Sequence, residues 1–128
     1  MNLKAIAEGL RGSRGVAHKR DIAEIVATLG IADPAAAIAV GDDCAAIPDG
    51  DGFLLLAIEG FMNEFVTTEP WFAGWCGVMV NVSDIYAMGG RPIAVVDALW
   101  SAGQARGRPV LDGLAAAART YGVPVVGG

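Results

Sequence analysis

The chain has 128 residues, of which 54% are hydrophobic and 18% charged, so it can form one domain with a real core and is neither disordered nor fibrous. A net charge of −5, without a sustained basic cluster, gives no support to nucleic-acid binding. Two cysteines, Cys44 and Cys76, are too few for a disulfide scaffold, and we expect a pair of buried thiols. No signal peptide follows Met1 and no apolar run could span a bilayer, so we expect a soluble, cytoplasmic protein with no membrane partner.

Apolar residues at helical spacing predict two short amphipathic helices near the N-terminus, over residues 3–10 and 19–29. Gly30 supplies the stop of the second helix, and Asp33 starts a turn or linker. We therefore expect residues 1–34 to form a helical N-terminal extension of the domain.

Beyond this extension, the hydrophobic pattern changes between the strand period and the helix period. In chain order we expect strands over 38–40 and 44–47, a hairpin-type connection over 48–52, a strand over 53–58, an irregular segment over 59–69, a helix over 71–88, a strand over 92–100, a helix over 110–121 that begins after Pro109, and a strand over 123–126. This order is typical of an α+β or α/β domain.

The predicted helix over 71–88 is hydrophobic nearly all round, which is typical of a buried helix, yet it contains an amide and a carboxylate. Asn81 and Asp84 share one face of it, because residues three or four apart are neighbours on a helix surface. A buried, unpaired carboxylate is costly, so Asp84 needs a cation or several donors. Two interpretations are open: a metal ligand, or a structural aspartate bonded to backbone amides or to Asn81. Gly89 or Gly90 suits a left-handed cap at the helix end.

A second acidic motif, Gly41-Asp42-Asp43-Cys44, lies between two apolar stretches. Adjacent carboxylates after a glycine suit a solvated turn, and they also suit a hard cation such as Mg²⁺, which prefers oxygen ligands. The residues alone leave both interpretations open.

Together these motifs resemble the family named for aminoimidazole ribonucleotide synthetase, which includes selenophosphate synthetase, thiamine-monophosphate kinase and formylglycinamidine ribonucleotide synthetase. The resemblance covers residues 40–128 and rests on Gly41-Asp42-Asp43-Cys44-Ala45, on the run from Asn81 to Pro92, and on Val125-Val126-Gly127-Gly128. It implies an α+β N-terminal domain whose mixed sheet is packed by helices and completed by homodimerisation. In the family a second, C-terminal domain follows, and we expect that domain to be absent from these 128 residues.

The function that the resemblance implies is a Mg²⁺-dependent ATP-binding domain of a small-molecule kinase or synthetase, which performs ATP-dependent phosphoryl transfer onto an acceptor that the sequence does not identify. Carried over residue by residue, it implies metal ligands at Asp42, Asp43, Glu59 and Asp84, and nucleotide contacts at Asn81, Gly127 and Gly128.

The sequence departs from the family pattern in two places. Where the family has Ser/Thr-Thr-Asp or Thr-Val-Asp, this chain has Ala57-Ile58-Glu59, which keeps the carboxylate and loses the hydroxyls. No cysteine lies near Lys19, which argues against selenophosphate synthesis by the usual route. These departures keep an alternative open, namely a non-catalytic nucleotide-binding or dimerisation domain of the same fold.

Overall fold

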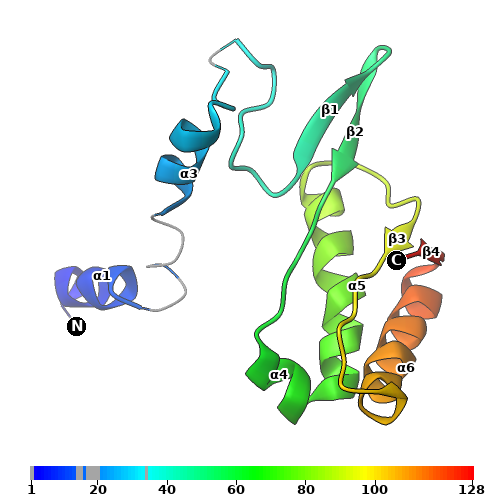
Figure 1. Cartoon of the computed structure of the whole chain (residues 1–128). Coiled ribbons are helices and arrows are strands. Elements are labelled where there is room, and N and C mark those ends of the chain that lie inside the picture. The colour runs from blue at the N-terminus through cyan, green and yellow to red at the C-terminus, as the bar shows by residue number, and fades with distance from the viewer. Residues whose placement is uncertain (1, 14–15, 17–20, 34) are drawn as a thin grey trace. The chain divides into compact units, whose positions relative to one another are not determined.

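The computed structural model describes residues 2–13, 16, 21–33 and 35–128, and it divides the chain into two compact units, Met1–Asp42 and Asp43–Gly128. Among its described residues, the first unit contains the helices α1 (Leu3–Arg11) and α3 (Ile22–Leu29), shown in Figure 1. None of its described residues is buried.

Both predicted N-terminal helices are confirmed within the described residues, and local capping explains their bounds. The Asn2 side chain accepts hydrogen bonds from the backbone N–H groups of Lys4 and Ala5 at 3.1 and 3.4 Å, which satisfies two donors at the start of α1. Gly30 ends α3 in the left-handed conformation, with φ 63°. The predicted start of that helix at Lys19, like His18 beside it, lies outside the described residues.

The strand predicted over 38–40 is wrong, because those residues form bends and a turn. The preceding turn is held by Asp33, whose carboxylate and backbone carbonyl accept from the N–H groups of Ala35 and Ala36 at 2.9 and 3.1 Å. A strand needs a partner for its backbone groups, and the described residues pair none with this segment.

The second unit begins with an antiparallel hairpin of β1 (Ala45–Asp49) and β2 (Gly52–Leu56), as predicted. The turn is shorter than expected: Asp49 pairs with Gly52, which leaves only Gly50 and Asp51 as loop residues. Gly50 has φ 59°, the positive value that two-residue hairpin turns require.

A short helix, α4 (Asn63–Thr68), occupies part of the segment predicted to be irregular. It ends against α5 (Pro70–Ala87), which confirms the predicted helix over 71–88. The N–H groups of Gly89 and Gly90 bond to Tyr86 and Ile85 carbonyls, and Gly89 has φ 74°, so a Schellman cap ends α5.

The last helix, α6 (Gln104–Tyr121), begins earlier than predicted and includes Pro109. The missing proline N–H removes one backbone bond near the helix start, and Gly107 in the turn before it packs closely on Ser101 and Leu99. Gly122 ends the helix with φ 67°.

Helix α6 connects β3 (Val95–Val96) to β4 (Val125–Gly127), and the two strands are parallel. This is a β-α-β unit. The predicted strand over 92–100 is thus reduced to two residues, and the described residues form two separate two-stranded sheets rather than one mixed sheet. Mixed α and β structure is confirmed; a single sheet is not.

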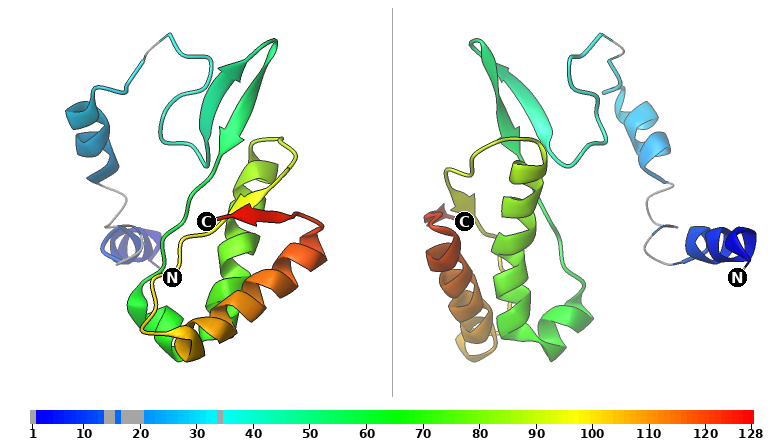
Figure 2. Two further views of the ribbon diagram at one scale, coloured as in Figure 1. Left: turned by 45° about the vertical axis from the view of Figure 1, so that its right-hand side comes forward. Right: turned by 180° about the vertical axis from the view of Figure 1, so that it is seen from behind.

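The core lies between α5 and α6, which run side by side in all three ribbon views (Figures 1 and 2). Its buried residues are Val78, Val82, Leu114, Ala117 and Val123. The helices approach so closely because each has a glycine at the crossing: a Cβ atom at Gly74 would overlap the backbone carbonyl of Val110, and one at Gly113 would overlap that of Trp71.

The expectation that α5 is buried nearly all round is wrong. Five of its residues are buried, and they lie on the sides covered by α6 and by α4: Ala73, Gly74, Cys76, Val78 and Val82. Trp71, Phe72 and Tyr86 are 46%, 50% and 57% exposed.

Candidate functional site

Asn81 and Asp84 lie one helical turn apart on α5, and both are half-buried. The Asn81 Nδ2 atom donates to the carbonyl of Gly77 at 2.8 Å, which fixes the orientation of the amide, because the oxygen could not bond there. Its Oδ1 atom is buried and has no partner among the described residues. Leaving such an acceptor unsatisfied costs about 1–3 kcal/mol, so this oxygen is suited to accept from a donor or to bind a cation.

Asp84 is less buried than its apolar surroundings led us to expect. Its carboxylate makes no hydrogen bond or ion pair with any described residue, since the Asn81 amide is directed to Gly77 instead. The structural interpretation, an aspartate tied to Asn81 or to backbone amides, is therefore not what the described residues form. A half-buried carboxylate without a partner is suited to a cation.

The acidic motif before the hairpin lies in a bend. Asp42 ends the first unit, Asp43 begins the second, and both side chains are exposed. Cys44, which follows them, is buried, as is Cys76 on α5, and both stand outside any disulfide, which confirms the expected pair of buried thiols.

Glu59 lies beyond the end of β2 and is exposed. It was expected at the end of this strand, so the strand ends earlier than the pattern indicated. Within the described residues, no three side chains of the Asp, Glu, His and Cys types gather closely enough to hold a metal ion. The metal positions Asp42, Asp43, Glu59 and Asp84 therefore stay predictions. The donor types, carboxylates and an amide oxygen, are nevertheless those that Mg²⁺ prefers.

Gly127 and Gly128 lie at the carboxyl end of β4, next to the carboxyl end of β3. The backbone N–H of Asp97 donates to the carbonyl of Gly127 at 3.0 Å. A Cβ atom at Gly128 would overlap the backbone of Asp97, so glycine is required there for this approach. Asp97 is not among the site residues predicted from the sequence. The repeated Val-Val run, before Asp97 and again before Gly127, was the signal that could have aligned the two strand ends.

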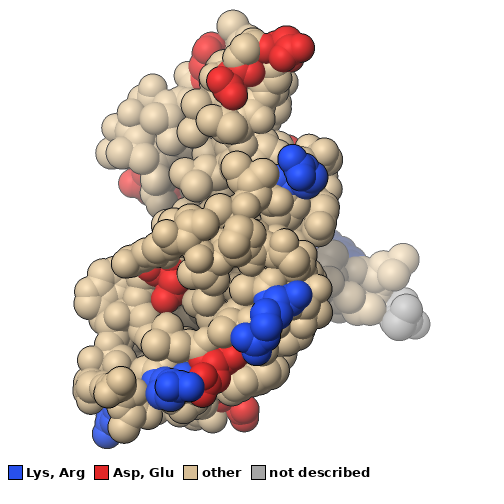
Figure 3. Space-filling model, turned by 90° about the vertical axis from the view of Figure 1, so that its right-hand side faces the viewer, with Lys and Arg blue, Asp and Glu red and all other residues tan. Residues whose placement is uncertain are grey.

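Charge is unevenly distributed over the face that includes α6. Figure 3 shows basic side chains following that helix, which contains Arg106, Arg108 and Arg119, while acidic ones gather at the hairpin turn, where Asp49 and Asp51 stand. Arg108 forms an exposed ion pair with Asp112 at 2.8 Å.

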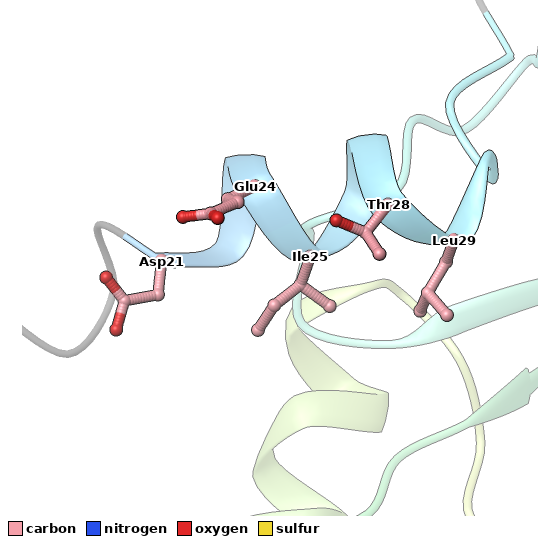
Figure 4. Close-up of a pocket in the computed structure, with 5 residues that line it drawn as sticks. All are labelled: Asp21, Glu24, Ile25, Thr28 and Leu29. Atoms are coloured by element: carbon pink, nitrogen blue, oxygen red, sulfur yellow. The ribbon is translucent and has the colours of Figure 1, made fainter.

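A shallow hollow in the first unit is lined by Asp21, Glu24, Ile25, Thr28 and Leu29 (Figure 4). All of these residues come from α3 and its first turn, so the hollow is one face of a helix and brings no groups together from different elements. No described helix combines the length and apolar character needed to cross a membrane.

Comparison with known proteins places this chain among relatives that are themselves uncharacterized. It is 59% identical over 78 residues to an uncharacterized protein of Synechocystis sp., a match covering 61% of this chain and 24% of the relative. It is 35% identical over 133 residues to an uncharacterized protein of Methanocaldococcus jannaschii, covering 100% of this chain and 41% of the relative. The chain thus spans less than half the length of these relatives. No solved structure matches it significantly.

Residues 41–128 match the family described as AIR synthase related protein, N-terminal domain. The matched region begins at the glycine of the acidic motif and runs through α5 to the Gly-Gly end of β4, so it includes all the candidate site residues. The chain belongs to the AIR synthase related family, of which it contains the N-terminal domain.

Proposed function

We propose that this domain binds ATP together with Mg²⁺, as one part of an enzyme that transfers a phosphoryl group from ATP to a small-molecule acceptor. Proteins of this family generally depend on ATP and Mg²⁺. The observation that carries the proposal to this chain is the polar face of α5, where a buried amide oxygen and a half-buried carboxylate both lack partners among the described residues.

That face is best explained by a ligand. A buried acceptor such as the Asn81 oxygen gains stability from a partner, and a bound cation or donor would supply one. The proposed metal ligands are Asp84 on this face, with Asp42, Asp43 and Glu59 from the acidic bend and from the segment after β2. The proposed nucleotide contacts are Asn81, Gly127 and Gly128.

In this proposal the chain's own residues position the nucleotide. The absence of side chains at Gly127 and Gly128 lets phosphate oxygens approach the backbone, and Asn81 offers an acceptor for a metal-bound water or a nucleotide hydroxyl. Bound Mg²⁺ supplies neutralisation of the phosphate charge, which is the main requirement of phosphoryl transfer.

A second candidate, a nucleotide-binding or dimerisation domain without chemistry, is favoured by two observations. Glu59 replaces the aspartate that the family pattern has, without its neighbouring hydroxyls. The β1–β2 hairpin also leaves apolar side chains exposed, with Phe53, Leu54 and Leu56 at 44%, 50% and 58% exposure.

In both candidates we propose that this hairpin forms part of a homodimer interface, because open strand edges and exposed apolar faces favour pairing with another copy.

Titration calorimetry with a non-hydrolysable ATP analogue tests the proposal, with and without Mg²⁺. We expect binding that requires Mg²⁺ and is lost in Asp84→Asn, while Asp112→Asn, which removes the same charge from an exposed ion pair, binds as the wild type does. Unchanged affinity in Asp84→Asn would refute the metal role. Binding by a longer protein that never turns ATP over, across candidate acceptors, would favour the second candidate.

A further inference from the structure

The β3–α6–β4 unit fixes which edge of its sheet faces a ligand. Parallel strands joined by a crossover helix have their carboxyl ends at the same edge, and ligands of such sheets bind outside that edge. At this edge β3 is followed by Asp97, and β4 ends in Gly127 and Gly128. A carboxylate and a glycine pair therefore share the edge.

The backbones of these residues are in direct contact. Asp97 donates its N–H to the carbonyl of Gly127 at 3.0 Å, and Gly128 lies so close to the Asp97 backbone that a side chain at position 128 would overlap it. The Asp97 peptide is thus the surface on which the glycine pair rests. Any residue at position 97 could supply the backbone contact, so the contact does not account for a carboxylate there.

The Asp97 carboxylate has no structural use among the described residues. The residue is half-buried, and its side chain makes no hydrogen bond or ion pair with any described residue. A phosphate held against Gly127 and Gly128 would lie beside this negative charge. Two like charges in such close proximity repel each other, and they do so more strongly at a protein surface than in water. A divalent cation between them converts that repulsion into attraction.

We propose that Asp97 is a further binding residue of this site, which holds the divalent cation that accompanies the phosphates at Gly127 and Gly128. The inference rests on the proposed nucleotide function and adds a consequence to it. Because Asp97 repels a phosphate that arrives without a cation, it makes nucleotide binding at this loop strictly dependent on the metal.

The test is calorimetry of a non-hydrolysable ATP analogue against wild type, Asp97→Asn and the control Asp112→Asn, over a series of Mg²⁺ concentrations. In Asp97→Asn we expect affinity at saturating Mg²⁺ to fall roughly 10–100-fold, the range typical of lost metal-site groups, while affinity without Mg²⁺ does not fall. Direct Mn²⁺ binding, followed by electron paramagnetic resonance, should weaken in the same variant. Asp112→Asn should match the wild type in both measurements.

The outcomes separate the two proposals. Wild-type affinity and wild-type Mg²⁺ dependence in Asp97→Asn would overturn the role of Asp97 and leave the nucleotide function standing. A wild type that shows no Mg²⁺-dependent binding would overturn the nucleotide function, and the inference with it. Thermal unfolding checks that each variant is folded. If Asp97→Asn is not, Asp97→Ser replaces it, with the same losses expected.

Discussion

The α5–α6 pair and the β1–β2 hairpin are both rich in apolar residues, but they differ in how much of that surface they bury. Val78 on α5 is 0% exposed, whereas Leu54 and Leu56 on β2 are 50% and 58% exposed. Helices satisfy their own backbone groups, so two of them can complete a core by packing side chains alone. A two-stranded hairpin leaves strand edges and faces open. The helix pair therefore forms a core within one chain, whereas the hairpin leaves apolar surface exposed.

The same contrast exists along α5 itself. Near its start the helix is closed against α6 by direct backbone approach at Gly74 and Gly113. About two turns further on, Asn81 and Asp84 keep polar groups without partners among the described residues. We interpret the contact with α6 as the source of stability and these polar groups as the place where a ligand completes the domain.

The largest expected effect comes from breaking the helix crossing. In Gly74→Ala the new Cβ would meet the backbone of Val110, which belongs to a helix and cannot yield locally, so the helices must separate. We expect a loss of about 3 kcal/mol or more in the free energy of unfolding, measured by denaturant titration. Gly77→Ala is the matched control on the same helix. Its Cβ would meet the Phe61 ring at 3.6 Å, an ordinary contact, so a gain of up to about 1 kcal/mol is expected. Equal losses in both variants would contradict the close crossing.

The next effect concerns the polar groups of α5, Asn81 and Asp84. At a nucleotide concentration 100 times the dissociation constant, and with Mg²⁺ present, binding should raise the free energy of unfolding by about 2.7 kcal/mol. Chelation of the metal should remove this gain, and Asp84→Asn should never show it. Thermal unfolding with and without the chelator measures the difference. Stabilisation that persists after chelation would mean that the nucleotide binds without the metal.

A substitution in the hairpin is expected to change the oligomeric state of the protein rather than its fold. If β1–β2 forms a dimer interface, Leu56→Asp should halve the mass measured by sedimentation, because a charge in an apolar interface is costly to bury. The control Leu111→Asp places the same charge on a residue of α6 that is 46% exposed, and it should leave the mass unchanged. A wild type that sediments as a monomer at all concentrations would contradict the interface.

The smallest effect is expected at the exposed ion pair on α6. Arg108 and Asp112 have side chains that are 71% and 50% exposed, so solvent screens their attraction. Asp112→Asn should change the free energy of unfolding by no more than about 0.5 kcal/mol. Denaturant titration at low and high salt measures this change, and a larger loss would show that α6 depends on surface charge as well as on packing.

Much of the local structure could be predicted from the sequence, because its causes are local. The helical period gave α5 nearly to the residue, Gly30 and Gly89 marked helix ends, and the Pro48–Gly52 segment marked a hairpin. Predictions failed where contacts overrode the local signal. Helix α6 runs through Pro109, where Gly107 packs on Ser101 and Leu99, and the strand predicted over 92–100 is reduced to the part that β4 pairs.

By itself the sequence determined the family, the succession of helices and strands, and the presence of an amide and a carboxylate on one face of an apolar helix. These features depend on periodicity and on short motifs, which are readable along the chain. Tertiary structure alone decided that α5 and α6 meet at Gly74 and Gly113, that β3 pairs with β4, and that Asp97 lies against Gly128. Those pairings join residues far apart in the chain, and their energy comes from surfaces that exist only once both elements have formed.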